Sequence, residues 1–180
     1  MKIQICALLA TSAVLQAQGV PPQANREAVI SPVPFERIQK AAAQEPQNWL
    51  TYSGGYNSNR HSQLSQITPE NAKDLTLKWV FQARSLEKHE VTPLVVDGVM
   101  YTVQGINDVI ALNAVTGKTI WTHPYKPSPD ARNCCGQETR GLAILGDKLF
   151  LATLDAHMIA LDAKTGKELW NTQAADAKEK

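Results

Sequence analysis

Cysteine is scarce in this chain of 180 residues, which has three, at positions 6, 134 and 135. So few thiols exclude a small scaffold held together by several disulfide bonds. The chain also lacks an excess of either charge, because 18 Lys and Arg residues stand against 17 Asp and Glu residues and the net charge is +1. A chain without a basic excess gives no electrostatic footprint for nucleic acid. We therefore expect no nucleic-acid partner.

Long apolar runs are also lacking, which predicts no transmembrane anchor in this segment. The N-terminal residues 1–17 (MKIQICALLATSAVLQA) combine the positive Lys2, an apolar run too short to span a bilayer, and the small residue Ala17 as a cleavage position. This pattern is typical of a signal peptide, and the alternative is a buried N-terminal helix. We expect export into an oxidising compartment, with cleavage removing Cys6.

The sequence after the signal peptide predicts an N-terminal arm over residues 18–48. Its first part, 18–34, is rich in Pro and Gln and has no apolar period, so we expect it to be loose. The stretch FERIQKAAAQ at 35–44 has good helix formers with apolar residues at helical spacing, and it predicts a short helix. Residues 51–63 are rich in Gly, Asn and Ser and predict a loop, and Thr-Pro-Glu predicts a helical turn at 69–74.

Short runs that are typical of β-strands fill the rest of the chain. They lie at residues 75–81, 93–103, 108–114, 118–123, 142–153, 157–163 and 167–172. Asp97-Gly98 and Gly146-Asp147 interrupt two of these runs with turn-forming pairs. Alternating strands and tight turns predict an all-β fold built from hairpins.

A repeat lies within these strands. Residues 109–121 read VIALNAVTGKTIW and residues 158–170 read MIALDAKTGKELW, an offset of 49 with eight of thirteen positions identical. A spacing of ~40–50 residues with four short strands in each unit is typical of β-propeller blades. The alternative, two unrelated hairpins that share Thr-Gly-Lys, does not account for eight identities.

Three positions of the repeat have a physical role. Asn113 and Asp162 can accept backbone hydrogen bonds in the turn after their strand. The glycine four residues later permits a positive φ, and the tryptophan that ends the unit is large enough to attach one blade to the next. We therefore expect Trp121 and Trp170 to be buried at equivalent positions.

Two such units cannot close a ring, because propellers have ~4–8 blades. A third, degenerate ending, LTLKW, lies at residues 75–79. We expect residues 49–180 to form about two blades of an incomplete β-propeller that is truncated at the C-terminus. The chain would then be the N-terminal fragment of a longer protein.

Two adjacent cysteines, Cys134 and Cys135, lie in RNCCGQETRG at residues 132–141. Neighbouring Cα atoms are ~3.8 Å apart, whereas disulfides usually join Cα atoms ~4.4–6.8 Å apart, so a bridge between them closes a strained ring. A vicinal disulfide, two free thiols and a metal-binding pair are the three alternatives. Export favours the disulfide, and the metal pair lacks a C-x₂-C spacing or a nearby His.

Arg140 and Glu90 are the charged candidates for a binding site. Arg140 follows Cys135 by five residues, and its guanidinium fork can bind a carboxylate or quinone oxygen. Glu90 stands at the start of the strand-like run HEVTPLVV. Each residue taken alone is more typical of a solvated surface. No nucleotide, zinc-protease, EF-hand or c-type haem motif is present.

The motifs together resemble a known family, the pyrroloquinoline quinone (PQQ)-dependent alcohol dehydrogenases, which are quinoproteins related to methanol and ethanol dehydrogenases. The matching segments occur in order, from about Ala41 to the end of the chain. They are NWLTYSGGYNSNRHSQLSQITPENAKDLTLKWVF, HEVTPLVVDGVMY, and two ALxAxTGKxxW units with NCCGQETRG between them. Other propellers share the blade unit, whereas the Cys-Cys-x₄-Arg element between two such units is specific.

The resemblance implies an eight-bladed propeller with PQQ on its axis. It assigns Cys134 and Cys135 to a vicinal disulfide that stacks on the quinone, Arg140 to the quinone oxygens, and Glu90 to a further PQQ contact. The ligands of a calcium or lanthanide ion and the catalytic Asp would lie beyond residue 180. The linker Gly-Gln-Glu-Thr before Arg140 is a departure that we cannot connect to a substrate class.

The implied activity is the oxidation of small alcohols in the periplasm, by hydride transfer to PQQ and electron transfer to a cytochrome c. One alternative is a non-enzymatic propeller scaffold of the outer-membrane assembly type, for which the Cys pair and Arg140 have no evident use. Another is a sugar-oxidising quinoprotein. The membrane-bound glucose dehydrogenases of that group carry several N-terminal transmembrane spans, which are absent here.

Overall fold

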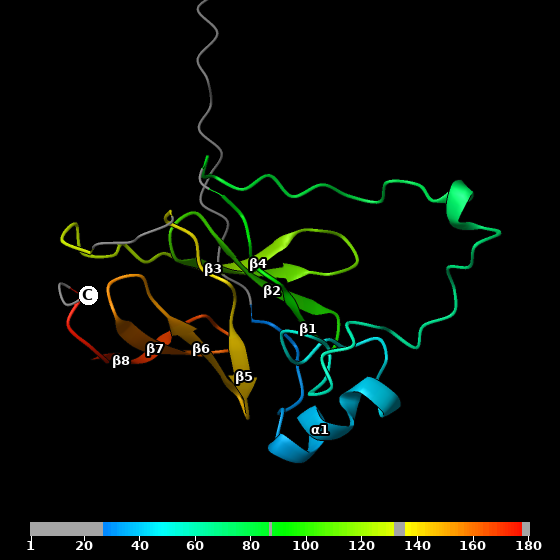
Figure 1. The fold of residues 1–180 in the computed structure, drawn as a ribbon, viewed down its shortest axis with the longest axis horizontal. Helices are drawn as coiled ribbons and strands as arrows, with labels where there is room; N and C mark the ends of the chain where they lie inside the picture. The colour runs from blue at the N-terminus through cyan, green and yellow to red at the C-terminus, as the bar shows by residue number, and fades with distance from the viewer. Residues whose placement is uncertain (1–26, 87, 132–135, 178–180) are drawn as a thin grey trace, which may run out of the picture.

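The computed structural model describes residues 27–86, 88–131 and 136–177, which form two antiparallel sheets beside a short helix (Figure 1). Each sheet has four strands in sequence order, β1-β2-β3-β4 and β5-β6-β7-β8. The first comprises β1 (Leu94–Val96), β2 (Val99–Gln104), β3 (Asp108–Asn113) and β4 (Thr119–His123). The second comprises β5 (Ala143–Leu145), β6 (Lys148–Ala152), β7 (His157–Asp162) and β8 (Glu168–Gln173).

The helix α1 is Phe35–Gln44, and a 3₁₀ turn spans Ala72–Asp74. No helix in these three ranges is long and apolar enough to cross a membrane.

The two sheets are built alike, as the 49-residue repeat predicted. In each sheet the pairing of the third and fourth strands shifts register at the same place, between Ala111 and Leu112 and between Ala160 and Leu161. The tryptophans lie in equivalent register, since Ala111 pairs with Trp121 and Ala160 pairs with Trp170. The predicted all-β fold and the interpretation as two propeller blades are confirmed.

The Thr-Gly-Lys turns form as the residue types predicted. Asn113 Oδ1 accepts hydrogen bonds from the backbone amides two and three residues later, at 3.0 and 2.9 Å. Asp162 Oδ1 does the same at 3.0 and 2.8 Å. Gly117 and Gly166 have φ of 68° and 71°, a left-handed conformation that a glycine adopts without steric cost.

Trp121 connects the first blade to the second. It is fully buried, and its indole lies flat against Gly166, where a Cβ atom would be 2.5–3.0 Å from three ring atoms. The indole Nε1 donates to the backbone oxygen of Ala163 at 3.3 Å. Tyr101 packs on the same indole, with ring centroids 5.8 Å apart, and donates its hydroxyl to the same oxygen at 2.9 Å. Trp121 therefore contacts the second blade at one glycine and one carbonyl.

The expectation that Trp121 and Trp170 would be equally buried is wrong. Trp170 is 41% exposed, whereas Trp121 is 0% exposed. The two exposed fractions differ because Trp121 is covered by the turn of the following blade. The described residues provide no blade after β8 that could cover Trp170 in the same way. Every residue of β8 is exposed.

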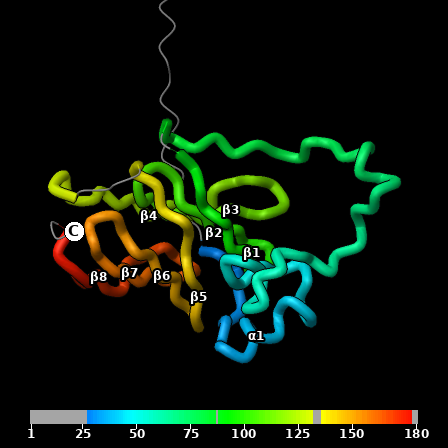
Figure 2. The backbone as a smooth tube through the Cα atoms, in the orientation of Figure 1, coloured from blue at the N-terminus to red at the C-terminus, as the bar shows by residue number. Residues whose placement is uncertain are grey.

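The predicted strand at 75–81 is also absent as a sheet strand, because this segment pairs with no strand in the described part of the chain. Figure 2 shows the preceding stretch running far out from the sheets before the chain returns towards β1. The segment still contacts the first blade through a tryptophan that lies on a glycine, as Trp121 contacts the second blade. Trp79 lies against Gly117, with ring atoms 2.5–3.0 Å from a Cβ position, and its Nε1 donates to Ala114 O at 3.1 Å.

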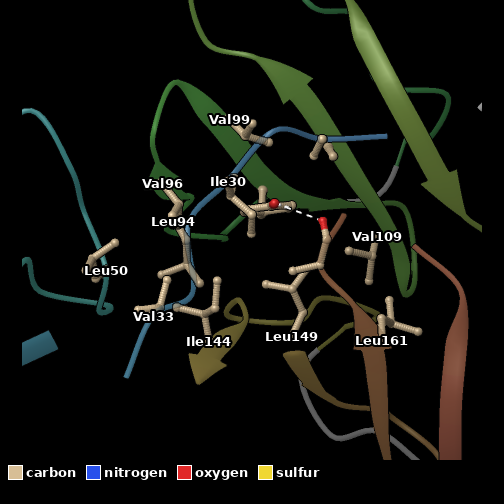
Figure 3. Close-up of a cluster of buried hydrophobic side chains, with 14 of the residues drawn as sticks. Ile30, Val33, Leu50, Leu94, Val96, Val99, Val109, Ile144, Leu149 and Leu161 are labelled. Carbon is tan, nitrogen blue, oxygen red and sulfur yellow. Dashed lines mark hydrogen bonds between the residues drawn. The ribbon is translucent and has the colours of Figure 1, made fainter. Parts of the chain in front are cut away.

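Residues 27–34 pack into the molecule, contrary to the expectation of a loose arm. Val33 and Gly146 exchange two backbone hydrogen bonds of 2.7 Å, and Ala28 N donates to Lys164 O at 2.7 Å. Figure 3 shows Val33 beside Leu94 of the first sheet and Ile144 of the second. The N-terminal segment therefore fills the space between the two blades and completes their shared core.

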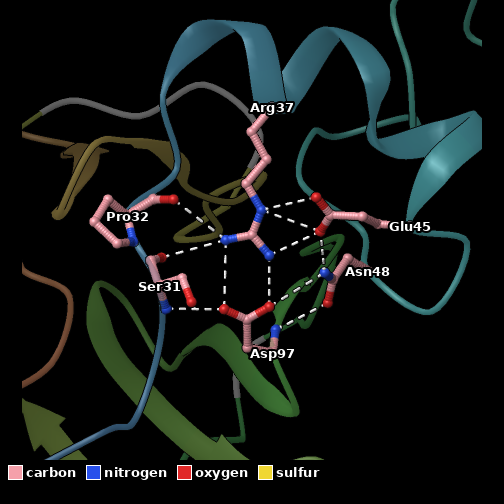
Figure 4. A network of polar contacts seen from close by, with 6 residues as sticks. All are labelled: Ser31, Pro32, Arg37, Glu45, Asn48 and Asp97. Atoms are coloured by element: carbon pink, nitrogen blue, oxygen red, sulfur yellow. Dashed lines mark hydrogen bonds and ion pairs between the residues drawn. The ribbon is translucent and has the colours of Figure 1, made fainter.

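An ion-pair network, which we call the Arg37 cluster (Arg37, Glu45, Asn48 and Asp97), fastens α1 to the turn between β1 and β2 (Figure 4). Arg37 Nη2 lies 2.7 Å from Glu45 Oε2 and 2.5 Å from Asp97 Oδ1. Asn48 donates to Glu45 Oε2 at 2.6 Å and accepts from Asp97 N at 2.9 Å. The hydrogen bond from Arg37 lowers the pKa of Glu45. Burial opposes the ionisation of Asp97, but hydrogen bonds from Arg37 and Ser31 outweigh it and lower that pKa as well.

Candidate functional site

The first strand of each sheet is preceded by a segment that carries one candidate residue. The segments before β1 and β5 run side by side, since Thr92 and Gly141 form a parallel bridge. Thr92 N donates to the backbone oxygen of Arg140 at 3.4 Å. Glu90 and Arg140 are 50 residues apart in sequence, and this bridge brings them to one place before the first strands of the two blades.

Arg140 and Glu90 form an ion pair, with Arg140 Nη2 3.2 Å from Glu90 Oε2. The Arg140 side chain is 72% exposed and that of Glu90 is 37% exposed. An exposed pair of this kind contributes about 0–1 kcal/mol to stability, because water screens the attraction. The fold therefore gains little from the pair, and most of the guanidinium surface is open to an oxygen-rich ligand.

The segment that leads to Glu90 is held by the end of β2. The amide of Arg84 donates to Gln104 Oε1 at 3.1 Å, and Gln104 is 4% exposed. Gly105, with φ of 56°, lets Ser85 approach, since a Cβ atom there would be 3.2 Å from the Ser85 Cβ. A glycine is needed at this turn for both its conformation and its lack of a side chain.

Cys134 and Cys135 lie outside the described residues, so their predicted pairing stays a prediction. The residues that follow them include one that sequence reasoning missed, Glu138. Its side chain is 9% exposed, and its Oε2 is buried with no hydrogen-bond partner in the described part of the chain. Glu138 Oε1 lies 3.9 Å from Lys88 Nζ. No spacing in the sequence indicated this burial, and its ion-pair partner Lys88 lies 50 residues away in sequence.

A separate hollow beside β1 has a volume of about 360 Å³ and does not include the candidate residues. It is lined by Pro46, Gln47, Asn48, Trp49, Ser62, Leu64, Thr92, Pro93 and Val95. None of these side chains carries a charge. A ligand with several carboxylates would find no cation there, so Glu90 and Arg140 define the candidate site better than this hollow does. No group of His, Cys, Asp and Glu suited to a metal ion occurs in the described ranges.

Antiparallel four-stranded blades joined by a tryptophan on a Thr-Gly-Lys turn define the class of protein, a β-propeller. The family model for the glucose, ethanol and alcohol dehydrogenase PQQ β-propeller domain matches residues 49–171. The chain belongs to this family.

Named relatives agree with the family model. The chain is 40% identical over 143 residues to the quinohemoprotein alcohol dehydrogenase ADH IIB of Pseudomonas putida, covering 78% of this chain and 21% of that protein. It is 42% identical over 134 residues to a 1-butanol dehydrogenase (cytochrome c) of Thauera butanivorans, covering 72% and 19%. Among solved structures, a europium-containing methanol dehydrogenase superposes with a TM-score of 0.71 at 37% identity, covering 77% of this chain and 25% of that one.

The chain thus spans about a fifth of the length of the curated relatives that it matches, 21% and 19% of the two named above. The matched part is the region of the two blades and the segment before them. The family and the propeller fold are therefore established for this chain. The activity of the full-length protein is a proposal.

Proposed function

We propose that this chain is one sector of a periplasmic quinoprotein that oxidises alcohols with PQQ and passes the electrons to a cytochrome c. The observation that carries the proposal is the Arg140–Glu90 pair, which lies between two blades of a PQQ propeller family. The Cys pair precedes Arg140 in the same connection between blades. The relatives named as alcohol dehydrogenases, one of them linked to cytochrome c, support the substrate class and the acceptor.

The donor set suits the cofactor that the family implies. PQQ is a planar quinone with carboxylates, so it needs cationic donors for its oxygens and a flat surface for its ring. Arg140 offers a largely exposed guanidinium fork, whose geometry matches carboxylate and carbonyl oxygens. Glu90 holds one nitrogen of that fork at 3.2 Å and thereby limits its orientation.

The chemistry divides between the cofactor and these side chains. When bound, PQQ supplies the carbonyl carbon that accepts hydride from the alcohol. Arg140 would donate hydrogen bonds to the quinone oxygens and stabilise the negative charge that develops on them. Cys134 and Cys135, joined in a vicinal disulfide, would form the flat surface against one face of the ring. The ligands of a calcium or lanthanide ion and the catalytic base would come from residues beyond 180.

An activity assay tests the proposal. The full-length protein, reconstituted with PQQ and either calcium or a lanthanide, should oxidise a primary alcohol with cytochrome c as acceptor. Replacement of Arg140 by Ala should lower kcat/KM by about 10²-fold or more, the usual loss when one charge-stabilising donor is removed. A reconstituted protein that oxidises no alcohol would contradict the proposed reaction, and activity on sugars instead would favour the sugar-oxidising alternative.

The disulfide proposal has its own test. Cys134 and Cys135 should resist alkylation in the active, non-reduced protein, as mass spectrometry after digestion would show. A vicinal bridge closes a minimal loop, so it restricts the unfolded chain far less than the ~3 kcal/mol of a 15-residue loop. We therefore expect the Cys134→Ala/Cys135→Ala double variant to lose much more activity than thermal stability. Two alkylated thiols in fully active enzyme would refute the bridge.

Export is tested at the N-terminus. Residues 1–17 lie outside the described residues, and the signal peptide is proposed from their sequence alone. The mature protein isolated from the periplasm should begin near residue 18, as N-terminal sequencing would show. A protein that keeps Met1 and stays with the cytoplasmic fraction would contradict export.

A further inference from the structure

Lys88 is a cation beside the candidate site that the proposed reaction does not use. Its Nζ lies 3.9 Å from Glu138 Oε1. Lys88 stands two residues before Glu90, and Glu138 stands two residues before Arg140. The Lys88–Glu138 pair and the Glu90–Arg140 pair therefore join the same two segments, each across 50 residues of sequence.

The backbone places the two ion pairs next to each other. The Thr92 amide donates to Arg140 O at 3.4 Å, and Thr92 forms a parallel bridge with Gly141, so the segments before β1 and β5 run side by side in the same direction. Two residues of chain span at most ~7 Å, which limits the distance between one ion pair and the next. The four charged residues therefore form one cluster at the start of both blades.

Burial separates the charges of this cluster by sign. The two acids and the two bases sum to a net charge of zero. The side chains of Lys88 and Arg140 are 65% and 72% exposed, whereas those of Glu90 and Glu138 are 37% and 9% exposed. The acids thus face the protein and the cations face solvent. A ligand that approaches from solvent meets positive charge.

A glycine lets Glu138 take its buried position. Gly136 has φ of 126°, and a Cβ atom there would collide with Glu138 Oε2, so the carboxylate lies against the backbone of Gly136. A buried carboxylate needs a cation to offset the loss of its water. Lys88 supplies that cation at Oε1. The buried acid in turn keeps the ammonium group close to Arg140.

We propose that Lys88 is a second cationic binding residue beside Arg140, and that the two cations bind separate carboxylates of one polycarboxylate ligand, PQQ. This inference rests on the proposed function. The Arg140 fork suits two parallel hydrogen bonds, whereas the Lys88 ammonium is a compact point charge that suits a single carboxylate. Glu90 and Glu138 limit the positions of the two cations before the ligand binds, which lowers the cost of ordering them.

The test compares Lys88→Met with Lys118→Met in the full-length protein. Met keeps most of the aliphatic stem and removes the charge. Lys118 is an exposed lysine in the turn between β3 and β4, where the Ala114 amide donates to Gly98 O at the end of the blade opposite to Arg140, so it is a matched control. Isothermal titration calorimetry with PQQ and with citrate, at low and at high salt, gives the dissociation constants. The melting temperature reports whether each variant is folded.

Lys88→Met should raise the PQQ dissociation constant about threefold to tenfold at low salt, the loss expected for one partly exposed charge pair. The difference from wild type should shrink at high salt, because salt screens exposed charges. Lys118→Met should change neither value. Lys88→Arg keeps the charge and should bind PQQ within about twofold of wild type.

A double variant, Lys88→Met/Glu138→Gln, separates a lost ligand contact from an indirect effect. If Lys88→Met weakens binding only because Glu138 is left without a cation, removal of the acid's charge restores the wild-type affinity, and the proposal is overturned. If Lys88 binds the ligand, the double variant stays weak. Equal PQQ affinities of Lys88→Met and Lys118→Met would also overturn the proposal.

The two ligands distinguish a failure of this inference from a failure of the proposed function. A wild-type protein that binds PQQ, with no effect of Lys88→Met, refutes this inference alone. A wild-type protein that binds citrate through Lys88 but binds no PQQ refutes the proposed function and supports the polycarboxylate site. A wild-type protein that binds neither ligand refutes both.

Discussion

Arg37 is the residue that joins the N-terminal helix to the first blade. Its partners Glu45 and Asp97 lie 8 and 60 residues away, and Asn48 hydrogen-bonds to Glu45 beside them. The Arg37 side chain is 15% exposed and each carboxylate side chain is 27% exposed, so water screens these pairs less than it screens surface pairs. The Arg37 cluster therefore holds α1 against the turn at Asp97, at the end of the blades opposite to Arg140.

Replacement of Arg37 by Met tests this role at neutral pH. The variant keeps the aliphatic stem but leaves Glu45 and Asp97 without their cation, so we expect the free energy of unfolding to fall by about 1–3 kcal/mol. Urea unfolding followed by tryptophan fluorescence measures the change. Lys40→Met on the exposed face of α1 is the control and should change stability little. Equal effects of the two substitutions would contradict the assignment.

The stability difference between wild type and the Arg37→Met variant should depend on pH. The pKa values of Glu45 and Asp97 are lowered in the folded protein, so their contribution to stability is present above the unfolded pKa values and is lost as the pH falls through the folded ones. The stability difference between wild type and Arg37→Met should therefore be full above about pH 5 and narrow below about pH 4, near and below the usual carboxyl values. A difference that grows on acidification would contradict the ion pairs.

At the scale of the element, a blade is attached to its neighbour by a tryptophan that lies on a glycine. Trp79 on Gly117 and Trp121 on Gly166 have the same geometry and donate to equivalent carbonyls, Ala114 O and Ala163 O. Since 114 and 163 also differ by 49, the contact of a tryptophan with the blade that follows it repeats with the sequence. Glycine is required at positions 117 and 166 for two reasons. The backbone has a positive φ there, and a side chain would collide with the indole.

Two glycines of the second blade separate these requirements. Gly146 and Gly166 have φ of 65° and 71°, but a Cβ atom at Gly146 meets nothing within 4 Å, whereas one at Gly166 meets Trp121. Gly146→Ala should cost about 1–2 kcal/mol for the left-handed backbone alone. Gly166→Ala should cost about 1–3 kcal/mol more, because it overpacks the indole. Urea unfolding of both variants measures the difference, and equal losses would show that the contact between blades contributes little.

The repeat made the strands and turns predictable, because each depends on residues that are close in sequence. Residues 75–81 have the composition of a strand and form none, since a strand also needs a neighbouring edge that local sequence does not report. The predicted burial of Trp170 is wrong for a related reason, because that burial depends on a blade that is not among the described residues. Sequence reasoning likewise could not find Glu138, whose partner Lys88 is 50 residues away.

The candidate site was predictable in part. Glu90 and Arg140 were found from a family motif, and the structure brings them to 3.2 Å from each other. Their pairing could not be derived from composition or spacing, since it depends on how the segments before β1 and β5 lie side by side. Cys134 and Cys135 lie outside the described residues, so their predicted role stays a prediction.

At the scale of the whole molecule, the two blades present surfaces that a ring of blades would cover. Trp170 and Leu169 on β8 are 41% and 44% exposed, and Leu77, beside Trp79 of the segment at 75–81, is 81% exposed. These lie on the last blade and on the segment before the first, where further blades would pack. A ligand on the axis of a propeller is contacted by several blades, so two blades offer only part of its site.

The central claim is that these residues form one sector of a PQQ-binding propeller, and a fluorescence titration of PQQ tests it most directly. The titration is run on the full-length protein, on its Arg140→Ala variant, and on the 180-residue chain alone. We predict saturable, tight binding by the full-length protein, clearly weaker binding by the variant, and no tight binding by the 180-residue chain. Nanomolar binding by the 180-residue chain, or no binding by the full-length protein, would contradict the account.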